Sequence, residues 1–149
     1  KINYMEARCC EEYKNSEETK YRDCCDDCKC CSLTDKDILY VITVVSNPAQ
    51  FNTRYRLFNE FCERMRGEKQ VELITVELQQ GNRPFATDSK IKLRTNDELW
   101  YKENLINIGV QHLPNNWKYM CWCDADIEFQ NKNWVRETIE QLQTYKILQ

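Results

Sequence analysis

The sequence lacks long apolar runs, a surplus of basic residues and, with one exception, histidine. Its longest apolar run, residues 38–45, is far shorter than the ~20 residues that a membrane-spanning helix needs, so we expect no membrane span. The net charge is -3, and no stripe of basic residues interleaved with aromatic ones occurs along the chain. Both observations disfavour nucleic acid as a partner, because its backbone binds basic surfaces.

The composition that remains is that of an ordinary globular protein. Of the 149 residues, 42% are hydrophobic and 30% are charged, which is enough for one core and an appendage. Four Trp, eight Tyr and five Phe residues indicate a packed domain with aromatic-lined surfaces. We therefore expect a soluble protein, whose cellular location the composition leaves unknown.

Cysteine is abundant, and most of it lies in the first 31 residues. Burial cannot offset the loss of chain entropy there, because large apolar residues are few, so the segment needs covalent or metal staples. The C-x2-C spacing of Cys25 and Cys28 fits a Zn²⁺ site. Three Cys-Cys pairs favour disulfides, which we prefer to zinc and to free thiols. The seven cysteines are Cys9, Cys10, Cys24, Cys25, Cys28, Cys30 and Cys31, and because seven is odd, one of them would pair outside the segment or with a protein partner.

We divide the chain into a cysteine-rich segment and linker, residues 1–37, and an α/β domain, residues 38–149. Apolar runs predict strands over residues 38–45, 71–78 and 117–123, and the first two runs are rich in β-branched residues. Apolar stripes at helical spacing predict helices over residues 53–66 and 99–113 and a third helix after Asn133. This alternation predicts an open, mostly parallel sheet with helices on both faces.

Local signals mark where these elements begin and end. We expect Gly67 to cap the first helix, Thr95 to open a capping box for the second, and Asn133 to cap the third. Residues 147–148 have the pattern of the start of a fourth strand. Since the chain begins with lysine rather than methionine and ends in that pattern, we expect the domain to be truncated at its C-terminus.

Polar side chains stand at the ends of the three expected strands. Ser46 and Asn47 follow the first strand, Glu77 lies near the end of the second, and Asp124 and Asp126 follow the third. Ligands of open α/β sheets bind beyond the carboxyl ends of the strands. We therefore expect these side chains to converge on one crevice.

The pair Asp124 and Asp126 is the most informative of these features. Successive side chains of a strand alternate between its faces, so both acids would lie on one side and Ala125 on the other. Carboxylate oxygens suit Mg²⁺ or Mn²⁺, which takes its other ligands from water and phosphate. The pair therefore predicts a metal-bound diphosphate, although an Asp-x-Asp sequence also marks solvated turns.

Other residues near the expected site also fit a purely structural role as an alternative to ligand binding. Glu77 fits a ligand as well as a solvated residue at a strand end. For three of the tryptophans we favour packing in the core or on the sheet over a role as a sugar platform. These tryptophans are Trp100, Trp122 and Trp134.

Several short segments, in this order, resemble the nucleotide-binding half of a GT-A glycosyltransferase. They are residues 44–48, Arg54, residues 76–77, residues 99–107, and residues 122–129 with Trp134. The resemblance covers about residues 39–149, excludes the cysteine-rich start, and extends to glycosyltransferases encoded by large DNA viruses and some bacteria. If the protein is viral, the virion or the host cytoplasm is the expected location.

The resemblance implies a role for each matching position. Asp126 would be the main ligand of a divalent cation, Mn²⁺ or Mg²⁺, that bridges the phosphates of a nucleotide-diphospho-sugar donor, and Asp124 would contact the ribose or the metal. Glu77 would face the nucleoside. The remaining positions would line the base pocket or meet the phosphates: Ser46 and Asn47 through their backbone, Arg54 through its side chain, and Lys102 and Asn104 as weaker candidates.

The function that the resemblance implies is metal-dependent transfer of a sugar to a glycan or protein acceptor. The acceptor-binding half of such a domain, with its third metal ligand and catalytic base, has no counterpart in this sequence, so we expect the chain as it stands to bind the donor rather than to transfer the sugar. The alternative is a cysteine-stapled structural or assembly protein, for example a viral capsid or scaffold component with a degenerate transferase fold. A zinc-binding interaction module is a third possibility.

Overall fold

A computed structural model describes residues 37–149 of the chain. The cysteine-rich segment falls outside these residues, and the predicted disulfides and the alternative zinc site fall outside them as well. The cysteines that are described, Cys62, Cys121 and Cys123, are free thiols. No helix of this part of the chain is both long and apolar enough to cross a membrane.

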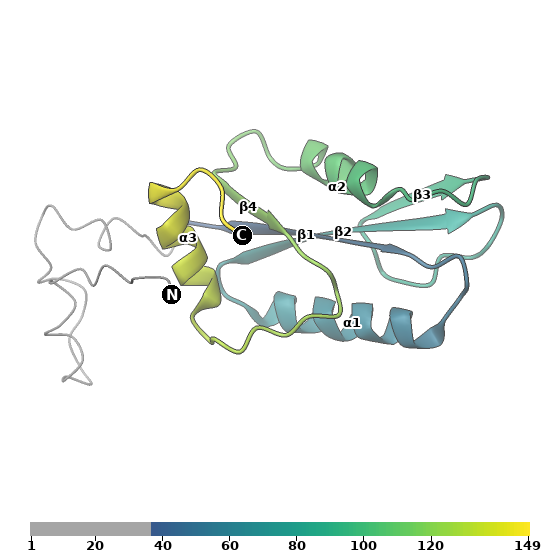
Figure 1. Cartoon of the computed structure of the whole chain (residues 1–149), viewed down its shortest axis with the longest axis horizontal. Helices are drawn as coiled ribbons and strands as arrows, with labels where there is room; N and C mark the ends of the chain where they lie inside the picture. Colours follow the sequence, from purple (N-terminus) through teal and green to yellow (C-terminus); the bar gives the residue numbers. More distant parts are fainter. Residues whose placement is uncertain (1–36) are drawn as a thin grey trace, which may run out of the picture. The chain divides into compact units, whose positions relative to one another are not determined.

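Residues 37–149 form an α/β fold in which a four-stranded parallel sheet carries helices on both faces (Figure 1). The strand order is β3-β2-β1-β4. The expected α/β architecture is therefore confirmed. In chain order the elements are β1 (Leu39–Ser46), α1 (Asn52–Gly67), β2 (Val71–Gln80), β3 (Ile91–Thr95), α2 (Lys102–Gln111), β4 (Tyr119–Trp122) and α3 (Trp134–Thr144).

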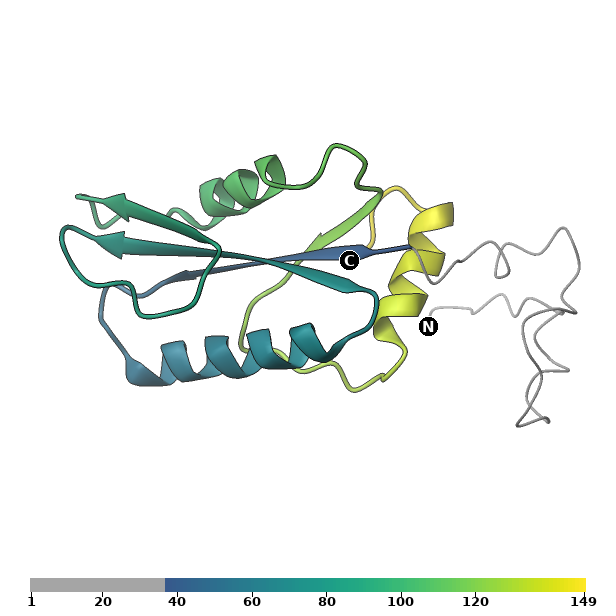
Figure 2. The same ribbon diagram turned by 180° about the vertical axis from the view of Figure 1, so that it is seen from behind.

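The two central strands, β1 and β2, carry the core. They pair in parallel along the whole length of β1, from Leu39 opposite Val71 to Ser46 opposite Leu78. Helices α1 and α2 cover opposite faces of this pair, as Figures 1 and 2 show from two sides. Both faces are apolar because each is covered, which explains the continuous apolar pattern of residues 38–45. The core on the α2 side consists of Ile42, Ile74, Val76, Leu78, Ile91, Leu105 and Leu113.

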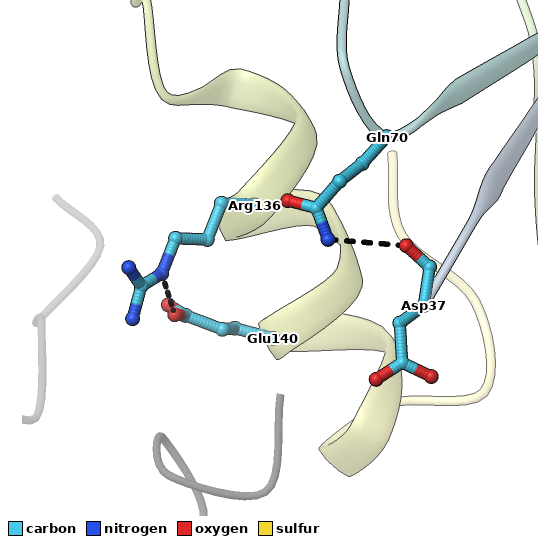
Figure 3. Close-up of polar contacts among 4 residues, drawn as sticks. All are labelled: Asp37, Gln70, Arg136 and Glu140. Atoms are coloured by element: carbon cyan, nitrogen blue, oxygen red, sulfur yellow. Dashed lines mark hydrogen bonds and ion pairs between the residues drawn. The ribbon is translucent and has the colours of Figure 1, made fainter. Parts of the chain in front are cut away.

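At the ends where β1 and β2 begin, side-chain contacts tie neighbouring segments together (Figure 3). The amide of Gln70 donates a hydrogen bond of 3.1 Å to the backbone oxygen of Asp37. Helix α3 lies beside these ends, and its Arg136 donates a hydrogen bond of 2.8 Å to Glu140 one turn further on. Helix α3 therefore stands at the opposite end of the sheet from the carboxyl ends of the strands.

Several expected element boundaries were wrong. Strand β3 was not foreseen, although residues 91–95 alternate between apolar and polar as an edge strand does. Thr95 ends β3 instead of capping a helix, because its hydroxyl accepts the backbone N–H of Asp97, and α2 begins only at Lys102. Gly67 is the last residue of α1 itself, and the capping position falls on Glu68.

The end of the chain also differs from expectation. Asn133 occupies the N-cap position of α3 but makes no side-chain capping hydrogen bond, and its backbone N–H donates to the side chain of Asn131. Residues 147–148 form no strand, and Ile147 is 83% exposed. Strand β4 is only four residues long and pairs with β1 alone among the described strands.

Gly109 lets α2 approach the sheet closely, and its replacement by alanine provides a test of this packing. A Cβ atom at this position would lie 2.7 Å from Cγ2 of Ile42, a branched side chain with little freedom to move. We expect Gly109→Ala to lower the free energy of unfolding by about 1–2 kcal/mol, because overpacking outweighs the gain of about 1 kcal/mol in helix propensity.

Urea unfolding measures this effect, and Gly67→Ala is the matched control. A Cβ atom at Gly67 would meet nothing within 4 Å, so this variant should be as stable as the wild type or slightly more stable. If Gly109→Ala also left the stability unchanged or raised it, the close approach of α2 to β1 would be contradicted.

Candidate functional site

A cavity of about 690 Å³ lies beyond the carboxyl ends of β1 and β4, which is within the usual size range of small-ligand sites. Its walls come from four segments: the end of β1, the turn into α1 with the first turns of that helix, the residues just before α2 with the start of that helix, and the turn after β4. The lining residues are Val44, Val45, Ser46, Pro48, Phe51, Thr53, Arg54, Leu57, Phe58, Leu99, Trp100, Tyr101, Lys102, Leu105, Asp124, Ala125 and Asp126.

The strand order explains why a cavity forms at this place. From β1 the chain passes through α1 to β2 on one side, whereas α2 leads back to β4 on the other side of β1. The two helices lie on opposite faces of the sheet, so they diverge at the boundary between β1 and β4 (Figure 2). Such a reversal of direction is where open α/β sheets bind their ligands.

Two helix N-termini supply positive charge to the cavity. The N-cap residues of α1 and α2, Phe51 and Tyr101, make no capping hydrogen bond with their side chains. The first backbone N–H groups of a helix lack intrahelical partners and carry a partial positive charge, which favours an anion. Two full charges stand in the same first turns, Arg54 in α1 and Lys102 in α2.

The acid pair lies opposite these groups. Asp124 and Asp126 are exposed and both line the cavity, and the ammonium group of Lys102 forms an ion pair with Oδ1 of Asp124. The two acids share the cavity for a different reason from the alternation of side chains along a strand that was expected. Strand β4 ends at Trp122, so the acids belong to the following turn, and Ala125 lines the same cavity instead of pointing to the other face.

The two carboxylates of the cavity suit Mg²⁺ or Mn²⁺, but they do not form a metal site built from protein ligands alone. Among residues 37–149, no group of three His, Cys, Asp or Glu side chains is placed to hold a metal ion. The two carboxylates would therefore leave most coordination positions to phosphate oxygens and water. This is how Mg²⁺ is usually held in phosphate-binding proteins.

Ser46 and Arg54 reach the cavity, whereas Asn47 does not line it. Arg54 donates a hydrogen bond of 3.1 Å to the backbone oxygen of Ser46. The side chain of Asn47 is buried and bridges the turn, donating to the backbone oxygen of Phe51 at 2.9 Å and accepting from its N–H at 3.1 Å. Asn47 thus positions the start of α1 from behind the site.

Glu77 lies outside the cavity and holds a loop of the protein instead. Its side chain is fully buried, and its carboxylate accepts four hydrogen bonds. The donors are the backbone N–H of Ala86 at 2.6 Å, the side-chain amide of Gln79 at 2.7 Å, the hydroxyl of Thr87 at 2.7 Å and the backbone N–H of Thr87 at 3.1 Å. Burial by itself raises the pKa of this carboxyl, but the hydrogen bonds outweigh it and hold the pKa below its usual value.

The connection between β2 and β3 explains the role of Glu77. It contains no helix, so the loop over residues 81–90 must satisfy its backbone groups in another way. Alternate residues of β2 provide the partners: Thr75 accepts the N–H of Lys90 at 2.9 Å, and Glu77 accepts those of Ala86 and Thr87. Thr75 and Glu77 of this strand therefore hold the loop.

Exposed apolar residues form part of the cavity, a feature that the sequence interpretation missed. Trp100 is 77% exposed, and Phe51 and Leu99 are also exposed. Contrary to expectation, Trp100 therefore packs neither in the core nor on the sheet. Trp122 is not in the core either, and it lies in β4, exposed and outside the cavity. Trp134 is buried as expected and stacks on Phe129 with ring centroids 3.8 Å apart.

One local signal for Trp100 was present in the sequence. The residue precedes a helix whose first-turn Glu103 lies within reach, and the indole N–H donates a hydrogen bond of 3.2 Å to that carboxylate. Hydrogen bonds from its own backbone N–H and from this indole lower the pKa of Glu103. The ring is thus held at the cavity by a polar contact rather than by burial.

Comparisons with protein families, curated proteins and solved structures find no match to this chain. The interpretation of the site therefore depends on its residues and their geometry.

Proposed function

We propose that this domain binds a nucleotide-diphospho-sugar together with a divalent cation, as the donor-binding part of a glycosyltransferase. The observation that carries the proposal is the meeting of an acid pair, two cationic side chains and two helix N-termini around one cavity at the sheet's reversal point. A diphosphate needs positive groups for its oxygens, and a cation bridging those oxygens needs carboxylates.

Each group of the cavity has a distinct task in this proposal. The N–H groups at the start of α1 and α2, with Arg54 and Lys102, bind and orient the phosphates. Asp124 and Asp126 hold Mg²⁺ or Mn²⁺, which when bound stabilises negative charge on the departing diphosphate as a Lewis acid. The exposed rings of Phe51 and Trp100 offer flat apolar surface to the nucleoside or the sugar.

The proposal assigns donor binding to this chain and assigns no catalytic base. Asp124 and Asp126 are the only carboxylates among the lining residues, which include no histidine, and the proposal gives both acids to the metal and Asp124 also to Lys102. Transfer to an acceptor would draw on residues outside the described cavity.

Calorimetry with the full chain tests the proposal. We expect UDP or GDP to bind at least tenfold more tightly with Mn²⁺ than with a chelator, because the metal joins the phosphates to the acid pair. The unphosphorylated nucleosides are the control, and their affinity should not respond to Mn²⁺. Equal affinity for the diphosphates with and without metal would contradict the proposal, and no binding under either condition would favour the assembly function.

A further inference from the structure

Lys102 occupies the position that a metal ion would otherwise take beside Asp124. Its ammonium group contacts Oδ1 of Asp124, and its side chain is only 31% exposed although it carries a charge. Lys102 is also the one lysine of the described chain that lines the cavity. Arg54, the other cation of the cavity, donates a hydrogen bond to the backbone oxygen of Ser46, so the ion pair with Asp124 is made by Lys102.

We infer that Lys102 is an internal counter-ion that competes with the divalent cation for Asp124 and is released when phosphate binds. This inference rests on the proposed function and adds an order of binding to it. A cation arriving alone must displace the ammonium group from a carboxylate oxygen and withstand its repulsion. Metal binding to the ligand-free protein is weakened for both reasons.

A bound diphosphate removes this obstacle. Lys102 is the first residue of α2, so phosphate oxygens drawn to the N-terminus of that helix are within the range of its flexible side chain. Once the ammonium group pairs with phosphate, both oxygens of Asp124 are free for the metal. Metal and diphosphate therefore strengthen each other's binding, and by linkage the coupling is the same in both directions.

The substitution Lys102→Met separates this role from simple phosphate binding. Methionine keeps the length and the apolar stem of the side chain but removes its charge. A divalent cation and an ammonium group about 5 Å apart repel each other. Even in water this repulsion is large enough to change the affinity for the metal roughly tenfold. We therefore expect Lys102→Met to bind Mn²⁺ roughly tenfold more tightly than the wild type when no nucleotide is present.

Electron paramagnetic resonance of free Mn²⁺, titrated into the full chain, measures this affinity directly. Lys102→Arg keeps the charge, so its Mn²⁺ affinity should not rise as that of Lys102→Met does. Lys118→Met is the matched control, because it removes the charge of an exposed lysine that pairs with Asp37, and neither residue lines the cavity. Adding UDP should tighten Mn²⁺ binding in the wild type and in Lys118→Met, and do so several-fold less in Lys102→Met.

The failure of this inference differs from failure of the proposed function. If Asp126→Ala weakens Mn²⁺ binding but Lys102→Met leaves it unchanged or weaker, the site exists and the competition by Lys102 is overturned. If no variant, including Asp126→Ala, alters Mn²⁺ binding, the acid pair holds no metal and both proposals fail. Thermal unfolding of each variant shows whether the fold is retained.

Discussion

We expect the replacement of Glu77 by alanine to lower the free energy of unfolding, measured by urea denaturation, by about 3–5 kcal/mol. The substitution removes the acceptor of four hydrogen bonds. The hydroxyl of Thr87 can turn to Ser89, 2.6 Å away, but the N–H groups of Gln79, Ala86 and Thr87 lose this acceptor, and each such buried group costs about 1–3 kcal/mol before the loop relaxes. Glu72→Ala is the matched control, since Glu72 lies on the same strand but its side chain is half exposed. Its ion pair with Lys90 is long, at 3.7 Å, and therefore weak. This control should change the stability by no more than about 0.5 kcal/mol.

The pH dependence of stability gives this prediction a second readout. The pKa of Glu77 in the folded protein lies below its ordinary value of 4.5, so the ionised carboxylate stabilises the fold at neutral pH. That contribution is complete above about pH 4.5 and is lost as the pH falls from there through the folded pKa. The stability gap between the wild type and Glu77→Gln should therefore shrink below pH 4.5. A gap that stays constant into acid, or a Glu77→Ala variant as stable as Glu72→Ala, would contradict the loop-holding role.

Replacing Asp126 by alanine is expected to abolish the metal dependence of diphosphate binding. Loss of a direct ligand should weaken metal binding at least as much as loss of a supporting residue does, which is typically tenfold to a hundredfold. In calorimetry with Mn²⁺, the affinity of the variant for UDP should fall to the value that the wild type shows with a chelator. Because Asp126 is exposed in a turn, the thermal stability should not change.

Two further variants make the assignment specific. Asp124→Ala should also remove the metal dependence, but it frees Lys102 for phosphate, so UDP should bind more tightly than to the wild type in the presence of a chelator. Glu128→Ala removes an exposed acid two residues further on that does not line the cavity, and it should behave as the wild type. If Asp126→Ala retained the full Mn²⁺ effect, or if Glu128→Ala lost it, the acid pair would not be the metal site.

The fold could be predicted in outline because local patterns suffice for it. The unbroken apolar pattern of residues 38–45 indicated a central strand covered on both faces, and β1 is such a strand. Strand β3 was missed because it is short and lies at the edge of the sheet, where only alternate residues are covered. Predicted boundaries were wrong where a polar residue fits two local structures. Thr95 has the side chain of a helix cap, but its hydroxyl accepts a hydrogen bond from Asp97 in the loop after β3.

The candidate site was predicted only in part, for a different reason. Asp124 and Asp126 were predicted to follow the third strand, with Ser46 and Arg54 in the same site, and the structure brings all four to one cavity. Glu77 also lies near a strand end, yet its side chain is enclosed by a loop that no local pattern announces.

The sequence by itself determined the α/β class and the strand ends that carry polar residues, because periodicity and element order are local properties of the chain. Only the tertiary structure decided which of those residues share the cavity. It set Glu77 against the loop after β2, and it brought Lys102 from the start of α2, and Trp100 from just before that helix, to the cavity of the acid pair. The physical reason is that alternation along a strand shows which side chains share a face, but strand order and loop packing decide what that face meets.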